Sequence, residues 1–338
     1  MKRILFYSSV NSLELFKTQK FYQIDISILK DLGYDVLLSN RIFDSLLFWK
    51  YDILFSYFYR YSFFAALLAK CFGKKTYFTG GIDSLDSDYA SAFNYKIQAL
   101  FFKLCYWVAD SCIIVSQSDS KNIFKVSSLK KKLSYSEHVI NTKLFIADVP
   151  KEKIFTSIVW MGDEGNVVRK GVDKALQIFA ELKKIPEFVD YRFVIIGRKG
   201  EGEVLVRSII DKYNLKGSVE LKGEVSEEDK INLLKQSKYY FQLSLYEGFG
   251  LAALEALCAN NIIIHSGKGG LANPIYKEQL LFDIDNDFDS ELLKLVNKLA
   301  CFTPITSYDN LLEYYDIQRR KDDFEAIIVN GKSNYKLK

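Results

Sequence analysis

The chain has 338 residues, of which 49% are hydrophobic and 26% charged, and this ordinary globular composition excludes wholesale disorder. The formal charge of +4 is unevenly spread, because residues 1–150 carry 19 Lys and Arg against 13 Asp and Glu. Such an excess suits an anionic membrane surface or a phosphorylated partner as well as a plain solvated surface, and it does not require nucleic acid.

Short apolar runs alternate with helical patterns from the first residue. Strands are predicted at 3–8, 34–38, 52–56, 75–79 and 111–115, with helices at about 15–32, 62–72, 88–108 and 117–127. This alternation predicts a parallel sheet covered by helices on both faces. The first run lacks the features of a signal peptide, and Asp52 and Arg60 interrupt the most apolar segment. With five scattered cysteines and no Cys-x-x-Cys pair, we expect a cytoplasmic chain that does not cross a membrane.

The polar stretch 141–153 breaks this rhythm and predicts a domain boundary. The alternation then restarts, with predicted strands at 154–160, 192–197, 218–222, 239–243 and 261–265 and predicted helices at 171–184, 203–213, 226–236, 250–259 and 288–301. We therefore expect two α/β domains of the Rossmann-like, doubly wound type, over residues 1–147 and 148–305, facing each other across a cleft at the carboxyl ends of the strands. Residues 306–338 are predicted to form a helix that packs back on the first domain and ends in a frayed tail.

A glycine-rich turn at residues 246–255, YEGFGLAALE, is the strongest chemical signal. Gly248 and Gly250 allow the backbone to approach a ligand, and the helix that follows points free N–H groups and its positive end outward. Glu247 and Glu255 flank this turn, and two carboxylates suit the hydroxyl groups of a sugar. The spacing alone is equally compatible with a helix that has an acidic first turn.

A second feature is the segment VVRKGVD at residues 167–173, which precedes a predicted helix. Arg169 and Lys170 can neutralise a phosphate group at this position. In isolation, a surface Arg-Lys pair is more often only solvated surface.

Residues 154–275 resemble the donor-binding domain of retaining GT-B glycosyltransferases of glycosyltransferase family 4. Six segments occur in the order typical of that family: IVWMG, RKGVD, FVIIG, LKGEVSEEDKINLL, SLYEGFGLAALEALCAN and IIIHSGKGGL. The resemblance implies that Glu247 contacts the donor sugar, that Glu255 holds the ribose and that Lys170 binds the diphosphate. It further implies that the turn Gly248, Phe249, Gly250 and Leu251 contributes backbone N–H groups, and that the turn from Gly223 to Val225 frames the nucleobase.

The sequence departs from the family pattern at two places. The family usually has Gly-Arg at the end of the first donor-domain strand, where this chain has Gly162 and Asp163 followed by a longer predicted loop, so Arg169 is the replacement cation. In the first domain, Gly80 stands where the family often has a histidine, and Asp83 becomes the alternative catalytic residue. A turn or N-cap role for Asp83 is equally compatible with the pattern.

Several other patterns have two interpretations. The acidic runs at 86–88 and 283–287 resemble metal-binding motifs, but the second precedes a predicted helix, and we favour capping by Asp287 over metal binding. His138 is predicted to end a strand near the domain boundary. His265 follows a predicted strand and could line the cleft, although a loop histidine is more often structural. Neither histidine has a Ser or Cys partner at a recognisable spacing. The helix at 94–108 mixes lysines with large apolar residues, which is typical of a membrane-surface helix as well as of a helix that covers a sheet, and we favour the second.

The sequence thus predicts a metal-independent, retaining hexosyltransferase that needs no cofactor. Its partners would be a nucleoside-diphosphate sugar, with UDP favoured over GDP, and a saccharide or lipid-linked acceptor in bacterial polysaccharide or lipopolysaccharide assembly, with peripheral contact at the inner face of the cytoplasmic membrane. The alternative hypothesis is a catalytically weak relative that binds a sugar nucleotide or glycan as a partner subunit. A nicotinamide-dependent enzyme is set aside, because no Gly-x-Gly-x-x-Gly follows the first strand.

Overall fold

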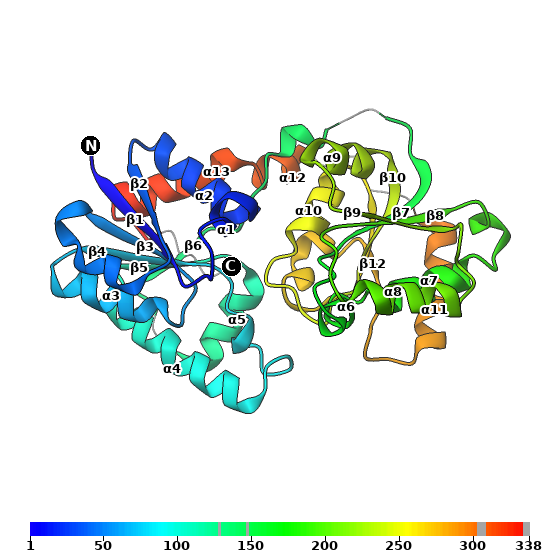
Figure 1. The fold of residues 1–338 in the computed structure, drawn as a ribbon, viewed down its shortest axis with the longest axis horizontal. Helices are drawn as coiled ribbons and strands as arrows, with labels where there is room; N and C mark the ends of the chain where they lie inside the picture. The colour runs from blue at the N-terminus through cyan, green and yellow to red at the C-terminus, as the bar shows by residue number, and fades with distance from the viewer. Residues whose placement is uncertain (128–129, 147–148, 303–308, 334–338) are drawn as a thin grey trace. The chain divides into compact units, whose positions relative to one another are not determined.

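The computed structural model describes residues 1–127, 130–146, 149–302 and 309–333, and the chain forms two compact units (Figure 1). Unit 1 contains Met1–Ile140 and the chain from Tyr314 onward, and unit 2 contains Asn141–Glu313. The divisions therefore fall at 140/141 and 313/314, whereas the sequence predicts them at 147/148 and 305/306. The chain passes between the units at these two places, and the two passages are hydrogen-bonded to each other: the Ile140 N–H donates to the Tyr315 carbonyl at 3.0 Å.

Unit 1 is built on a six-stranded sheet in the order β2-β1-β3-β4-β5-β6, in which every pair is parallel. The strands are β1 (Arg3–Ser8), β2 (Asp35–Ser39), β3 (Ile53–Tyr57), β4 (Lys75–Thr79), β5 (Ser111–Ile114) and β6 (Leu133–Tyr135). The helices that precede the crossing to unit 2 are α1 (Leu15–Thr18), α2 (Lys20–Asp31), α3 (Ser62–Cys71), α4 (Ala92–Val108) and α5 (Gln117–Val126). Apolar side chains of α3 and α4 cover one face of the sheet, and those of α1 and α2 cover the other.

Three predictions in unit 1 need correction. The helix predicted at 15–32 is two helices, because the backbone is extended at Gln19. The helix predicted from residue 88 begins at Ala92, because the Ser91 hydroxyl accepts from the Asn94 N–H and caps it. The strand predicted to end at His138 is β6, which has only three residues and ends earlier, at Tyr135.

The C-terminal segment packs on unit 1 through a buried ion pair. Helix α13 (Ile317–Phe324) places Arg320 against Asp25 of α2, with Nε–Oδ1 and Nη2–Oδ2 distances of 2.7 and 2.8 Å, and both side chains are fully buried. The Tyr57 hydroxyl donates to Asp25, and the Arg320 guanidinium also donates to the Ser136 carbonyl. Burial and the Asp25 carboxylate raise the pKa of Tyr57, so its phenol stays protonated and able to donate. The end of the predicted tail, residues 334–338, lies outside the described residues.

Unit 2 repeats the architecture with a parallel sheet in the order β12-β11-β10-β7-β8-β9. Its strands are β7 (Glu152–Ile158), β8 (Arg192–Ile196), β9 (Val219–Gly223), β10 (Ser237–Gln242), β11 (Ile262–His265) and β12 (Leu280–Leu281). Its helices are α6 (Glu164–Arg169), α7 (Val172–Leu182), α8 (Glu203–Lys212), α9 (Glu227–Gln236), α10 (Leu251–Cys258), α11 (Phe288–Cys301) and α12 (Asp309–Tyr314). The apolar stripe of α7 is buried in the core around Phe155, as its spacing predicts.

The predicted long loop before Lys170 is wrong. Residues Glu164–Arg169 form helix α6, which begins where the Asp163 carboxylate accepts from the Asn166 N–H at 2.6 Å. No helix among the described residues of either unit has the length and apolar character needed to cross a membrane.

The buried ion pair yields a stability prediction. Asp25→Ala leaves the Arg320 charge buried without its carboxylate, and breaking such a pair costs about 3–5 kcal/mol of unfolding free energy. Urea unfolding followed by circular dichroism measures this loss. The matched control is Arg192→Ala, which breaks a half-exposed pair with Glu152 and should change stability little. If Asp25→Ala lowered the unfolding free energy no more than the control does, the ion pair would not be what holds the C-terminal segment on unit 1.

Candidate functional site

The loop after β10 holds Glu247 in a fixed position. One carboxylate oxygen, Oε1, accepts hydrogen bonds from Lys170 Nζ at 2.5 Å, from Gln242 Nε2 at 2.8 Å and from the Ser244 hydroxyl at 2.8 Å. Gln242 is itself oriented by the buried Tyr240 hydroxyl, which donates to its Oε1 at 3.1 Å. Strand β10 therefore presets the direction of this carboxylate.

Lys170 reaches Glu247 because the junction of α6 and α7 lies against the same loop. The Leu245 N–H donates to the Arg169 carbonyl at 2.8 Å. A Cβ atom on Gly171, which has φ +68°, would lie 2.0 Å from the Leu243 carbonyl oxygen, so only glycine permits this approach. The ion pair is largely buried, with side-chain exposures of 21% for Lys170 and 12% for Glu247.

The glycine-rich turn leads directly into α10. Gly250 takes the left-handed conformation at φ +86°, the helix begins at Leu251, and Phe249 is buried. The Leu254 N–H donates to the Gly250 carbonyl, so the helix ladder uses none of the N–H groups of residues 251–253. These groups and the helix dipole make the turn suitable for an anion.

A second glycine pair, Gly269 and Gly270, packs against this turn. The Gly270 N–H donates to the Glu247 carbonyl at 2.6 Å, and a Cβ atom on Gly269 would lie 2.2 Å from that carbonyl oxygen. The turn and the segment after β11 are therefore packed backbone against backbone, and this contact explains Gly269 and Gly270 of IIIHSGKGGL.

Glu255 lies on the buried face of α10 and pairs with a cation that the sequence did not indicate. It is 4% exposed, and its Oε2 accepts from Lys230 Nζ at 2.7 Å. Burial lowers the pKa of Lys230, but the effect of the nearby Glu255 carboxylate is in the opposite direction, and the net result is a raised pKa. The lysine therefore stays charged. Glu247 and Glu255 are thus each paired with a different lysine.

The remaining predicted residues of unit 2 occupy neighbouring loops. Gly162 precedes the cap of α6, and the Arg169 guanidinium donates to the Asn166 side chain at 2.8 Å. Gly223 ends β9 with φ +76°, beside the side chain of Lys199, and Val225 packs on a small apolar cluster with Ile196. All of these loops follow the carboxyl ends of parallel strands, where ligands of α/β sheets bind.

The arrangement in unit 2 suits a ligand with both hydroxyl and phosphate groups. Glu247 offers a preset acceptor, Lys170 offers a fixed positive charge at the same point, and the start of α10 offers backbone donors. Gln242, Ser244 and Lys230 complete this site although they were not among the predicted residues. Lys230 and Ser244 lie within segments that carry the family resemblance and Gln242 lies just before one of them, but nothing in their own spacing marks them.

Asp83 belongs to unit 1, where it is exposed at the start of a short 3-10 turn (Asp83–Leu85) after β4. Beside it lies a carboxyl that was not predicted from the sequence. Asp119 of α5 is fully buried, its Oδ1 accepts from the Ile82 N–H at 3.2 Å, and its Oδ2 has no hydrogen-bond partner among the described residues. Burial raises the pKa of Asp119 to about 8, and the Asp83 carboxylate acts in the same direction.

The structure also shows the surroundings of other residues that had two interpretations. Asp287 caps α11 by accepting from the Ser290 N–H at 3.0 Å, and no group of three metal-ligating side chains occurs in the part of the chain that the structure describes. His265 is buried between the Gly267 N–H and the Tyr276 carbonyl, and burial lowers its pKa to about 4. His138 is buried against Phe21, in the segment after β6 rather than at a strand end. Both histidines are buried.

Comparison with known proteins gives a consistent result. Residues 165–299 match the family described as "Glycosyl transferases group 1". A GDP-mannose:cellobiosyl-diphosphopolyprenol alpha-mannosyltransferase from Xanthomonas oryzae pv. oryzae is 32% identical over 163 residues, which cover 42% of this chain and 40% of the relative. One of the subunits of human phosphatidylinositol N-acetylglucosaminyltransferase is 30% identical over 105 residues, or 31% of this chain and 21% of the relative.

The matched region thus spans less than half the length of these relatives. Among solved structures, Anabaena Alr3699/HepE in complex with UDP superposes with a TM-score of 0.72 at 13% identity, covering 98% of this chain and all of the other. A sucrose-phosphate synthase from Thermosynechococcus elongatus gives a TM-score of 0.65 at 16% identity, over 98% and 97% of the two chains. At these identities the similarity establishes the fold.

The buried Asp119 carboxyl yields a pH prediction. A folded pKa of about 8, above the ordinary value of 3.8, means that folding favours the protonated form. The resulting stabilisation is complete below about pH 4 and is lost as the pH rises through about 8. The groups that face Asp119 are the carboxylates of Asp83 and Asp86, the Ser116 hydroxyl and the Ile82 N–H. Asp119→Asn keeps a side-chain oxygen that can accept from the Ile82 N–H, and it removes the carboxyl group that titrates.

We therefore expect the melting temperature of the wild type to fall relative to that of Asp119→Asn between pH 4 and pH 8. The measurement is a series of thermal melts across this range, with Asp88→Asn on the exposed surface as the control. Parallel pH profiles for the wild type and Asp119→Asn would show that Asp119 is charged throughout.

Proposed function

We propose that the chain transfers a hexose-type sugar from a nucleoside diphosphate to a saccharide or lipid-linked acceptor. The proposal is supported by the match of residues 165–299 to the family described as "Glycosyl transferases group 1" and by the similarity of the fold to those of solved glycosyltransferases. The observation that carries the proposal is the triple hydrogen bond to Glu247 Oε1 from Lys170, Gln242 and Ser244, beside the start of α10. A preset acceptor next to a cation and a helix start matches a sugar joined to a diphosphate.

In the proposed reaction the donor diphosphate binds Lys170 and the N–H groups at the start of α10, which stabilise the charge of the departing nucleotide. Arg169 lies next along the chain and adds positive charge. Glu247 orients the donor sugar and stabilises charge near the anomeric carbon, while Glu255, positioned by Lys230, holds the ribose. Because these groups oppose the diphosphate charge, the proposal needs no metal and no cofactor.

Retention of the anomeric configuration is part of the proposal, with the acceptor attacking on the face from which the nucleotide leaves. Asp83 is proposed as the residue of unit 1 that takes the place of the family histidine. We favour a UDP-sugar and keep a GDP-sugar as the second donor. The Xanthomonas relative is named for GDP-mannose, and the Anabaena structure was solved with UDP.

The acceptor side of the proposal rests on the named substrates of the relatives. One relative acts on a diphosphopolyprenol and another belongs to an enzyme of phosphatidylinositol, both of which are lipids. We propose a lipid-linked saccharide acceptor in bacterial polysaccharide or lipopolysaccharide assembly. The enzyme would then work from the cytoplasm, in peripheral contact with the inner face of the membrane.

A second candidate function is a sugar-nucleotide-binding partner subunit with little catalysis of its own. The motivating observations are Gly80 and Asp163, which replace the family's usual histidine and arginine. Donor hydrolysis without acceptor separates the two candidates when the wild type is compared with Glu247→Ala. Tight donor binding with no turnover in the wild type would favour the binding role.

The donor site yields a mutational prediction. Lys170→Ala removes the charge that stabilises the leaving diphosphate, so we expect kcat/KM to fall by about 10²-fold or more. The donor is first identified from the rise in melting temperature with UDP-, GDP-, ADP- and dTDP-sugars. Lys212→Ala, which changes an exposed lysine at the end of α8, is the control with equal loss of charge. Unchanged donor affinity and turnover in Lys170→Ala would refute the site.

A further inference from the structure

Helix α4 has an unusual exposed face. Phe93, Leu100 and Trp107 are 72%, 56% and 67% exposed, and they recur at intervals of seven residues. The exposed lysines Lys96 and Lys103 lie between them at spacings of three and four. All five therefore share one side of the helix, which we call the α4 stripe, while Phe102, Cys105 and Tyr106 pack against the sheet.

Helices α3 and α4 carry exposed apolar side chains and no carboxylates. Neither α3 (Ser62–Cys71) nor α4 (Ala92–Val108) contains an aspartate or a glutamate. Tyr61 and Phe64, at the start of α3, are 52% and 43% exposed, and their rings lie 6.2 Å from that of Phe101 on α4. The exposed apolar surface thus continues from one helix to the next.

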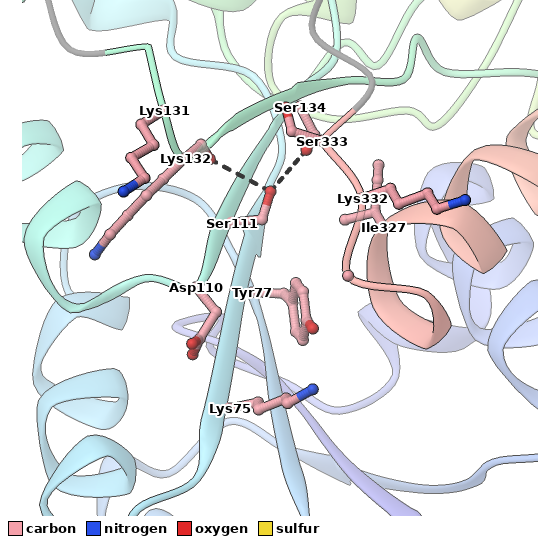
Figure 2. Close-up of a pocket in the computed structure, with 11 residues that line it drawn as sticks. Lys75, Tyr77, Asp110, Ser111, Lys131, Lys132, Ser134, Ile327, Lys332 and Ser333 are labelled. Atoms are coloured by element: carbon pink, nitrogen blue, oxygen red, sulfur yellow. Dashed lines mark hydrogen bonds between the residues drawn. The ribbon is translucent and has the colours of Figure 1, made fainter.

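A basic hollow of about 270 Å³ opens at the C-terminal end of α4 (Figure 2). Lys75, Lys131, Lys132 and Lys332 line it, and the one carboxylate among its described lining residues, Asp110, is paired with Lys70 at 2.9 Å. Lys132 joins the hollow to the α4 stripe, because its Nζ donates to the Trp107 carbonyl at 2.8 Å. In Figure 2 the ammonium groups of Lys131 and Lys132 lie on one side of Ser111 and that of Lys332 on the other.

The floor of this hollow carries hydroxyl groups. Ser111 and Ser134 are buried and hydrogen-bonded to each other at 2.9 Å. The C-terminal segment lines the other side of the hollow, and the Ser333 hydroxyl holds it in place by donating to the Leu133 carbonyl at 2.6 Å. Burial raises the pKa of Tyr77 to about 12, so its phenol is neutral. Lysines around hydroxyl groups form a site for a phosphate-bearing group.

We propose that the α4 stripe and this hollow together dock unit 1 onto an anionic lipid surface, with the hollow holding a lipid phosphate. The inference deepens the proposed function and rests on it for the lipid-linked acceptor, since it names the surface at which the enzyme would meet that substrate. Aromatic and leucine side chains interleaved with lysines are the composition of helices that lie in a membrane interface. The lysines attract the negative charge of the lipids, and the apolar side chains enter the headgroup region.

Charge favours a lipid surface over a second copy of the chain. In a two-fold dimer built on the α4 stripe, Lys96 and Lys103 would face the same lysines of the partner, and the like charges would repel. Lysine is also depleted in protein interfaces, whereas anionic lipids select it.

The test is co-sedimentation of the full chain with phosphatidylcholine vesicles, with and without phosphatidylglycerol. The wild type should bind only the anionic vesicles, and less at high salt. Leu100→Ser/Trp107→Ser and Lys96→Glu/Lys103→Glu should each weaken binding by about tenfold or more. The matched controls are Val189→Ser/Val204→Ser, two exposed apolar residues of unit 2, and Lys121→Glu/Lys125→Glu, two exposed lysines of α5; both should bind as the wild type does.

A direct readout comes from Trp107 in a chain that carries Trp49→Phe and Trp160→Phe. Its fluorescence emission should shift to shorter wavelength when anionic vesicles are added. Lys131→Ala/Lys332→Ala should weaken vesicle binding while leaving the melting temperature unchanged, because both side chains are exposed.

Three results would overturn the proposal. The first is equal vesicle binding by the wild type and the α4 stripe variants, or no binding at all. The second is a dimer in solution that Leu100→Ser/Trp107→Ser dissociates, without vesicle binding. The third is binding of inorganic pyrophosphate to Lys170→Ala that depends on Lys131 and Lys332, again without vesicle binding, which would assign the hollow to a soluble phosphate. None of these assays uses a donor sugar, so their failure is distinct from failure of the donor site.

Discussion

Both sheets are parallel throughout, and this constraint determines where chemistry can occur in each unit. Parallel neighbours require a crossover, so every strand delivers its following loop to the same edge. In unit 2 that edge collects the α6–α7 junction, the turn after β9 and the glycine-rich turn after β10, although these are far apart in sequence. Lys170 and Glu247 meet at 2.5 Å because two strands of one sheet deliver them there.

Two glycines of this site allow backbone to pack directly on backbone. Gly171 rests on the Leu243 carbonyl and Gly269 on the Glu247 carbonyl, at distances that leave no room for a Cβ atom. The loop that carries Glu247 is therefore held from two sides, by the α6–α7 junction and by the segment after β11. Such close support fixes the carboxylate before a ligand arrives, and preorganisation of this kind is what stabilises charge that develops during a reaction.

Sequence patterns predicted the strands of unit 2 within a few residues, the buried stripe of α7 and the cap of α11, because each depends on local spacing. They failed for the two-residue β12 and gave only an approximate end for the three-residue β6, because such short strands show no period. They also failed for Lys230, since its pairing with Glu255 depends on how α9 and α10 pack rather than on spacing within either helix. Asp119 resembles an ordinary first-turn helix residue until the fold buries it beside Ile82 and Asp83.

Helix α4 shows why one sequence pattern supported two interpretations. Its mixture of lysines and large apolar residues predicted either a helix covering the sheet or a helix at a membrane surface, and the structure divides these properties between its two sides. Phe102 and Cys105 are fully buried in the core of unit 1, while Leu100 and Trp107 point to solvent. A helix that is apolar on both sides normally has a partner on both. The excess positive charge of the first 150 residues, combined with the absence of carboxylates on α3 and α4, favours an anionic partner for the outer side.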